Sequence, residues 1–150
     1  MNAQGAVRRS SVATLQGFRD AGQRFAVLTA YDRATAELAE AAEIPAILVG
    51  DSLAQVALGH ESTVRVGMSE MRHHVAAVVR SSRTALVIAD MPFLSYVDVA
   101  TAATNASAFL RDAGAGARRL RCVCGTSRSC ACSACTARTC QRGFCTTSAR

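Results

Sequence analysis

Three short apolar runs, each ending in an aspartate, constrain the fold of this chain more than any other feature. The runs are Phe25–Asp32, Ala46–Asp51 and Ala85–Asp90, and all are rich in valine, leucine, isoleucine or alanine. Apolar runs of this length are typical of strands that are buried on both faces of a parallel sheet. An aspartate that ends such a strand lies at the carboxyl-terminal edge of the sheet, where α/β proteins place their chemistry.

Segments with helical periodicity separate the apolar runs. Residues 11–22, 33–43, 69–80 and 98–114 carry apolar residues at a spacing of three or four and are predicted to form helices. Residues 53–67 lack this period and are predicted to form a long connection. Strands that alternate with helices in this way indicate an α/β fold with a parallel sheet.

The predicted helices carry recognisable caps and apolar faces. Ser69 and Asp98 stand where N-terminal caps are expected, because short polar side chains accept hydrogen bonds from free backbone N–H groups. Asp32 immediately precedes a predicted helix and is interpreted as structural. The faces expected to be buried are Ala34, Leu38 and Ala41 in the second helix and Met71, Val75, Val78 and Val79 in the third.

Charge is distributed unevenly along the 150 residues. The formal net charge is +6, but residues 1–117 hold ten arginines and eleven acidic residues, whereas residues 118–150 hold seven arginines and no acidic residue. The main body therefore gives no support to nucleic-acid binding. No apolar run is long enough to span a membrane, and no apolar signal core follows Arg8 and Arg9. We expect a cytoplasmic protein.

The composition changes at about Ala117. Residues 118–150 contain all seven cysteines and few aliphatic residues, so we expect a disordered tail there, as we do for residues 1–10. One hypothesis is that the tail is an out-of-frame translation of GC-rich DNA. The alternatives are a disulfide scaffold, for which seven is an odd count, and a zinc site that uses the close pairs Cys122/Cys124, Cys130/Cys132 and Cys132/Cys135.

Asp51 and Asp90 are the candidate metal ligands. If the strands that they end are neighbours, the two carboxylates lie roughly 5–10 Å apart across the edge of the sheet. Two carboxylates with open positions for water and substrate suit Mg²⁺. The alternative is that both aspartates cap helices or bind loop amides. Ser52 could bind the carboxylate of a ligand or serve as a local hydrogen-bonding group.

No histidine or tyrosine is assigned to chemistry from the sequence. His60, His73 and His74 do not share a metal-ligand spacing, and we expect surface or loop positions for each. Tyr31 and Tyr96 are expected to be packing residues near the edge of the sheet.

Four motifs follow one another along the chain: Leu28–Asp32, Leu48–Ser52, Gly59–Thr63 and Ala89–Phe93. With these motifs in this order, the chain resembles ketopantoate hydroxymethyltransferases from Val12 to about Ala117. That family consists of (β/α)₈ barrels of the phosphoenolpyruvate/pyruvate superfamily. The chain would then be the amino-terminal part of such a TIM barrel, with residues 11–117 as the partial barrel.

The resemblance implies an activity in pantothenate biosynthesis. The family transfers a one-carbon unit from 5,10-methylenetetrahydrofolate to 3-methyl-2-oxobutanoate, which gives 2-dehydropantoate, and its members form homo-oligomers. By resemblance, Asp51 and Asp90 bind Mg²⁺, and Asp51, Ser52 and Asp90 contact the keto acid. The metal would stabilise the enolate of the keto acid as a Lewis acid.

The chain departs from the family pattern after Ala117. Arg119 stands where the family has a substrate-binding lysine, and Arg121 where it has a metal-binding glutamate. The family's proton-acceptor glutamate has no counterpart, so no catalytic residue is assigned and we expect the chain to be inactive as written. A barrel needs about 250 residues, and a partial one exposes apolar surface, so we also expect poor solubility.

Two other functions are open on the sequence alone. One is a different Mg²⁺-dependent lyase or transferase of the same superfamily that acts on a 2-oxo acid. The other is a non-catalytic metal- or nucleic-acid-binding protein that uses the cysteine- and arginine-rich tail.

Overall fold

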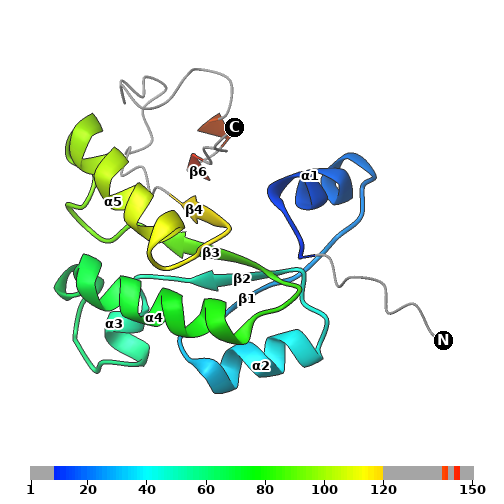
Figure 1. Cartoon of the computed structure of the whole chain (residues 1–150), viewed down its shortest axis with the longest axis horizontal. Coiled ribbons are helices and arrows are strands. Elements are labelled where there is room, and N and C mark those ends of the chain that lie inside the picture. Colours follow the sequence, from blue (N-terminus) through cyan, green and yellow to red (C-terminus); the bar gives the residue numbers. More distant parts are fainter. Residues whose placement is uncertain (1–8, 120–139, 142–143, 146–150) are drawn as a thin grey trace.

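A four-stranded parallel sheet forms the centre of the molecule. The computed structural model describes residues 9–119, 140–141 and 144–145. The strands β1 (Val27–Thr29), β2 (Ala46–Val49), β3 (Leu86–Asp90) and β4 (Ala117–Arg119) lie side by side in that order, and each neighbouring pair is parallel. Figure 1 shows the sheet with its helices. This arrangement confirms the predicted α/β class and parallel sheet.

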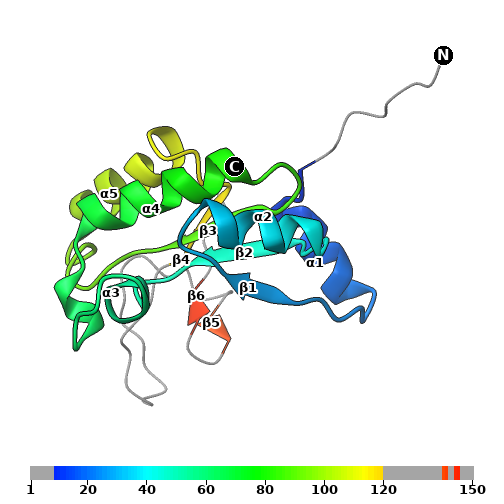
Figure 2. The same cartoon turned by 90° about the horizontal axis from the view of Figure 1, so that it is seen from below.

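Three helices cover one face of the sheet. They are α2 (Arg33–Ala41), α4 (Met68–Ser81) and α5 (Val99–Arg111), and each connects two consecutive parallel strands. Figure 2 shows the three helices together on one side of the sheet. Strand, helix and strand in this order make the repeated βαβ unit of a (β/α) barrel, and four such strands correspond to half of the eight that close one.

The remaining elements are short. α1 (Val12–Asp20) is capped by Ser11, whose hydroxyl accepts a hydrogen bond from the Thr14 N–H at 3.2 Å. The connection predicted as a loop contains a single helical turn, α3 (Leu53–Val56), and a 3₁₀ turn, η1 (Thr63–Arg65). The strands β5 (Cys140–Gln141) and β6 (Phe144–Cys145) form an antiparallel pair.

β1 differs from its prediction as a doubly buried strand. It has only three residues, and all three are exposed, with Val27 at 46% and Leu28 at 44% exposure. The expected burial on both faces was wrong for this strand, which lies at the edge of the sheet and pairs with β2 alone among the described residues. Phe25, just before the strand, is 37% exposed as well.

Two helix predictions also need correction. α2 buries Ala36 and Ala39, whereas Leu38 is 70% exposed and Ala34 and Ala41 are also exposed. The small methyl groups let α2 approach the sheet closely, so the larger Leu38 side chain faces outward.

The cap of α4 was also predicted wrongly. The N-terminal cap is Gly67 and not Ser69, and the Glu70 carboxylate accepts a hydrogen bond from the Gly67 N–H at 3.1 Å. This is the bond that the glutamate of a capping box makes to the cap residue.

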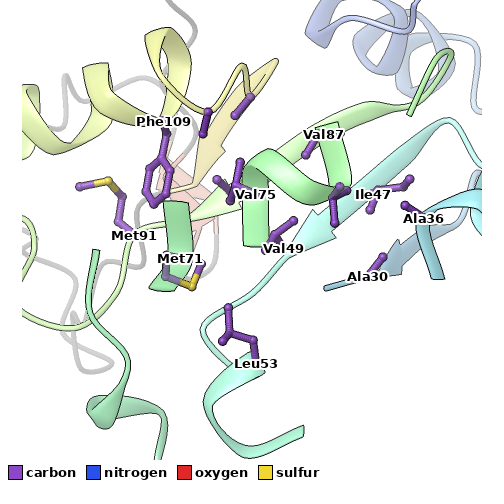
Figure 3. Packing of buried hydrophobic residues seen from close by; sticks show 14 of the residues in the cluster. Ala30, Ala36, Ile47, Val49, Leu53, Met71, Val75, Val87, Met91 and Phe109 are labelled. Carbon is purple, nitrogen blue, oxygen red and sulfur yellow. The ribbon is translucent and has the colours of Figure 1, made fainter. Parts of the chain in front are cut away.

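The core lies between the covered face of the sheet and the three helices. Its largest fully buried side chains include Phe109 of α5, Met71 of α4 and Ile47 of β2. Figure 3 shows these residues converging with Val49, Val75 and Val87 in one cluster. The predicted buried face of α4 is confirmed for Met71, Val75 and Val78, while Val79 is half-buried.

The chain approaches β3 closely at Gly116. The Gly116 N–H donates to the Val87 carbonyl oxygen at 3.0 Å, which brings the backbone directly over the neighbouring strand. A Cβ atom at this position would lie 2.6 Å from Leu86 Cδ1, closer than two carbons can pack. Gly116 therefore lets β4 enter the sheet beside β3.

The start of β3 is held by one carboxylate of α2. Glu40 accepts hydrogen bonds from the Ala85 N–H at 2.8 Å, from the Thr84 N–H at 3.0 Å and from the Thr84 hydroxyl at 2.7 Å. Burial raises the pKa of the Glu40 carboxyl, but these hydrogen bonds outweigh it, so the pKa lies below its ordinary value of 4.5.

Several sequence predictions fall outside the described residues. The cysteine pairs proposed for zinc and the position of Arg121 are among them. In the part of the chain that the structure covers, no helix combines the length and the apolar character needed to cross a membrane.

We expect Glu40→Gln to lower the free energy of unfolding at neutral pH by about 1–2 kcal/mol, because an amide NH₂ would face backbone N–H donors. Since the folded-state pKa is lowered, the contribution of Glu40 is complete above its unfolded-state pKa and is lost as the pH falls through the folded-state value. Urea unfolding from neutral pH to about pH 3 should therefore show the difference between wild type and variant shrinking on acidification.

Glu37→Gln on the same helix is the matched control. Glu37 forms an exposed ion pair with Arg33 at 2.7 Å, and its loss should change stability by less than about 0.5 kcal/mol. Equal costs for the two variants would contradict the role given to Glu40.

Candidate active site

Two carboxylates lie together at the carboxyl-terminal edge of the sheet. Val49 of β2 is in register with Ala89 of β3, so Asp90 lies opposite Gly50, and Asp51 follows one residue further on. Both side chains are buried, with 7% exposure for Asp51 and 3% for Asp90. The structure thus brings the two predicted metal ligands to neighbouring strand ends.

Gly50 makes room for the polar groups around it. A Cβ atom at this position would lie 3.0 Å from Ser52 Oγ and 3.5 Å from Asp90 Oδ2. The Asp90 carboxylate and the Ser52 hydroxyl therefore both border the small space above Gly50. All three candidate site residues predicted from the sequence, Asp51, Ser52 and Asp90, belong to this one edge of the sheet.

Tyr31 and His74 extend the polar network beyond the predicted residues. The Tyr31 hydroxyl is 2.8 Å from Ser52 Oγ, and the His74 Nδ1 lies 2.7 Å from the Tyr31 carbonyl oxygen. Tyr31 is half-buried against the core, in keeping with its predicted packing role, but it also bonds a site residue. Neither contact was predicted from the sequence.

The signal that could have found His74 is its place on α4. It lies three residues after Met71 and four before Val78, which puts it on the buried face of the helix. His74 is half-buried and bonded to the main chain, so the surface or loop position expected for it was wrong.

The other candidate aspartates are structural. Asp32 caps α2 by accepting from the Thr35 N–H at 2.8 Å, and Asp98 caps α5 by accepting from the Thr101 N–H at 2.9 Å. Hydrogen bonds from Thr35 and Thr101 hold the pKa of each carboxyl below its usual range. Both predictions, a structural Asp32 and a helix cap at Asp98, are confirmed.

The two carboxylates fit a divalent cation of the Mg²⁺ type. Mg²⁺ retains several waters and needs only one or two protein carboxylates, and Asp51 and Asp90 supply two at adjacent strand ends. Within the described residues, no group of three or more histidine, cysteine, aspartate or glutamate side chains converges on one point. A closed all-protein metal cage of the zinc type is therefore not found in that part of the chain.

A polar cavity of about 660 Å³ lies elsewhere, between α2 and α4. Its lining includes Arg33, Arg80, Arg83 and Glu40, and contains neither Asp51 nor Asp90. The cavity opens on the helix layer and not at the strand ends. Because (β/α) barrels place their chemistry at the carboxyl-terminal edge, we assign the candidate site to the aspartates.

The chain is similar in sequence to one family of transferases. The family model described as ketopantoate hydroxymethyltransferase matches residues 9–136. The 3-methyl-2-oxobutanoate hydroxymethyltransferase of Chloroflexus aggregans is 49% identical over 112 residues, and that of Carboxydothermus hydrogenoformans is 50% identical over 113 residues. These matches cover 75% of the chain but only 40% and 41% of the two relatives, so the chain spans less than half of their length.

Two solved structures are similar to this chain in fold. A 2,3-dimethylmalate lyase of the PEP mutase/isocitrate lyase superfamily matches with a TM-score of 0.56 at 21% identity, over 72% of this chain and 38% of that one. A phosphonopyruvate hydrolase in complex with oxalate and Mg²⁺ matches with a TM-score of 0.57 at 20% identity, over 69% of this chain and 36% of that one. At 20–21% sequence identity, these structural matches are evidence for the fold alone. They confirm the predicted partial barrel.

We expect Gly50→Ala to displace the Ser52 hydroxyl and to lower the free energy of unfolding by about 0.5–1.5 kcal/mol, the value of one hydrogen bond. The reason is the 3.0 Å approach of the added methyl group to Ser52 Oγ. Urea unfolding should show this cost in the wild type and a smaller one in a Tyr31→Phe background, where the Tyr31–Ser52 bond is already absent.

Gly17→Ala in α1 serves as the control. Nothing lies within 4 Å of the added methyl group there, and alanine should stabilise the helix by up to about 1 kcal/mol. A Gly50→Ala variant as stable as wild type would rule out the crowding described above.

Proposed function

The chain belongs to the ketopantoate hydroxymethyltransferase family, and we propose that its Asp51–Asp90 edge forms the cation- and keto-acid-binding part of that family's active site. The observation that carries the proposal is the convergence of Asp51, Ser52 and Asp90 on adjacent strand ends. The match of the family model to residues 9–136 supports it.

The reaction that we propose is hydroxymethyl transfer to 3-methyl-2-oxobutanoate, with 5,10-methylenetetrahydrofolate as the one-carbon donor and 2-dehydropantoate as the product. Relatives about half identical in sequence carry the name 3-methyl-2-oxobutanoate hydroxymethyltransferase. The chain spans 40% of the length of such a relative. We therefore propose the reaction for the active site of the whole family member, to which this chain contributes the Asp51–Asp90 edge.

Asp51 and Asp90 are the residues that would hold Mg²⁺. When bound, the ion acts as a Lewis acid that makes the C–H next to the keto group more acidic. Burial of both aspartates keeps bulk water away from their carboxylates, which strengthens their attraction for a cation. Ser52, beside Asp51, presents a hydroxyl to the same space and would donate it to the carboxylate of the keto acid.

Positions after Ala117 limit what the chain can do with a bound keto acid. The family resemblance places a substrate-binding lysine at position 119 and a metal-binding glutamate at position 121, and both are arginine here. A guanidinium cannot coordinate a cation, because it has no acceptor lone pair. We therefore propose that the chain binds Mg²⁺ and keto acid and does not complete the transfer.

The second candidate is another 2-oxo-acid enzyme of the superfamily, such as a lyase or hydrolase. The solved structures of a lyase and a hydrolase are about 20% identical to this chain, so they are evidence for the fold alone. Relatives at 49% and 50% identity are named transferases, and they favour the first proposal.

We expect the full chain to bind Mg²⁺ in calorimetric titration, and each of Asp51→Asn and Asp90→Asn to weaken binding by about tenfold or more, because each removes a charged ligand. Addition of 3-methyl-2-oxobutanoate should then give a second binding signal that depends on Mg²⁺.

Asp20→Asn is the matched control. Asp20 is exposed, and within the described residues its one ion pair is with Arg19. Its Mg²⁺ affinity should equal that of the wild type. Mg²⁺ binding that survives both site substitutions would refute the proposed site.

A further inference from the structure

One residue, through its side chain and its main chain, links three elements at the candidate site. Tyr31 follows β1 by two residues, its hydroxyl lies 2.8 Å from Ser52 Oγ at the end of β2, and its carbonyl oxygen lies 2.7 Å from His74 Nδ1 on α4. Its ring packs against the core. Tyr31 therefore fixes the place of the Ser52 hydroxyl relative to both strands and to the helix layer.

The direction of the Tyr31–Ser52 hydrogen bond decides what Ser52 can offer a ligand. A serine hydroxyl has one hydrogen to donate. If Ser52 donated to Tyr31, only its lone pairs would face an incoming carboxylate, and these would repel it. If Tyr31 donates, the Ser52 hydrogen is available to the carboxylate, and a phenol O–H is a stronger donor than an aliphatic hydroxyl.

His74 holds the other end of Tyr31. A carbonyl oxygen can only accept, so the 2.7 Å contact requires that His74 Nδ1 carries the hydrogen. His74 therefore anchors the Tyr31 main chain to α4.

We propose that Tyr31 is a positioning residue of the keto-acid site: by donating its hydroxyl hydrogen to Ser52 Oγ, it directs the Ser52 hydroxyl hydrogen toward the carboxylate of the substrate. The inference rests on the function proposed above, because it needs a carboxylate ligand beside Ser52. It adds Tyr31 to that site and says which of Tyr31 and Ser52 donates in the hydrogen bond between them.

The test is a double-mutant cycle on the full chain with Tyr31→Phe, Ser52→Ala and the double variant. The readout is the dissociation constant for 3-methyl-2-oxobutanoate at saturating Mg²⁺, measured by calorimetry. We expect Tyr31→Phe to weaken binding about five- to tenfold in the wild-type background and less than about twofold in the Ser52→Ala background, since coupled residues are not additive. The affinity for Mg²⁺ alone should not change.

Ser107→Ala controls for the loss of a hydroxyl elsewhere. Ser107 donates to the Ala103 carbonyl oxygen within α5 and is exposed, so this variant should bind the keto acid as the wild type does. If Tyr31→Phe weakens binding equally in both backgrounds, its role is structural and the proposal is overturned. An unchanged affinity in the wild-type background overturns it too.

The hydrogen bond is also tested without any ligand. In a ¹³C-labelled chain, the Tyr31 hydroxyl hydrogen should exchange slowly enough to give an NMR cross-peak to the Ser52 β-hydrogens, lost in Tyr31→Phe. Absence of the cross-peak in the wild type overturns the positioning role alone. Failure of the wild type to bind Mg²⁺ and keto acid, with the cross-peak present, overturns the proposed function and with it the substrate-directed role of Tyr31.

Discussion

The parallel pairing of β2 with β3 is the constraint on which the site depends. The register of Val49 with Ala89 puts Gly50 opposite Asp90 and brings Asp51 to the same edge. A shift of one residue would turn every side chain of one strand to the other face and separate the two carboxylates. Glu40 and the core residues of α4 matter to the site because they hold β3 in place. Glu40 binds Thr84 and Ala85, just before the strand, and Val75 and Val78 belong to the core of the molecule.

The polar groups at the edge depend on small residues beneath them. Gly50 leaves the space that Asp90 and Ser52 border, and Gly116 lets the next strand approach β3 closely. A Cβ atom at Gly50 would crowd Ser52, and one at Gly116 would crowd Leu86. Two of the motifs that carry the family resemblance, Leu48–Ser52 and Ala89–Phe93, contain the residues that form this edge of the sheet.

Much of the fold could be predicted from local sequence, because the signals are local. Asp32 and Asp98 cap their helices as short polar side chains do, and the spacing of Met71, Val75 and Val78 gave the buried face of α4. The exposure of β1 and of Leu38 could not be predicted, since it depends on which strands are neighbours and how closely a helix approaches. Asp51, Ser52 and Asp90 were found as strand-end residues. The spacing of His74 from Met71 and Val78 could have shown its burial but not its partner, because the contacts of Tyr31 with Ser52 and with His74 join positions 21 and 43 residues apart.

The exposed edge strand β1 sets a kinetic limit on the isolated chain. Its backbone N–H and C=O groups, beside exposed Phe25, Val27 and Leu28, form a template to which another extended segment can add. Such addition is second order in chain concentration, whereas folding is first order. Dilution therefore favours the folded single chain over strand addition, and the concentration at which the chain is studied decides which of the two species is observed.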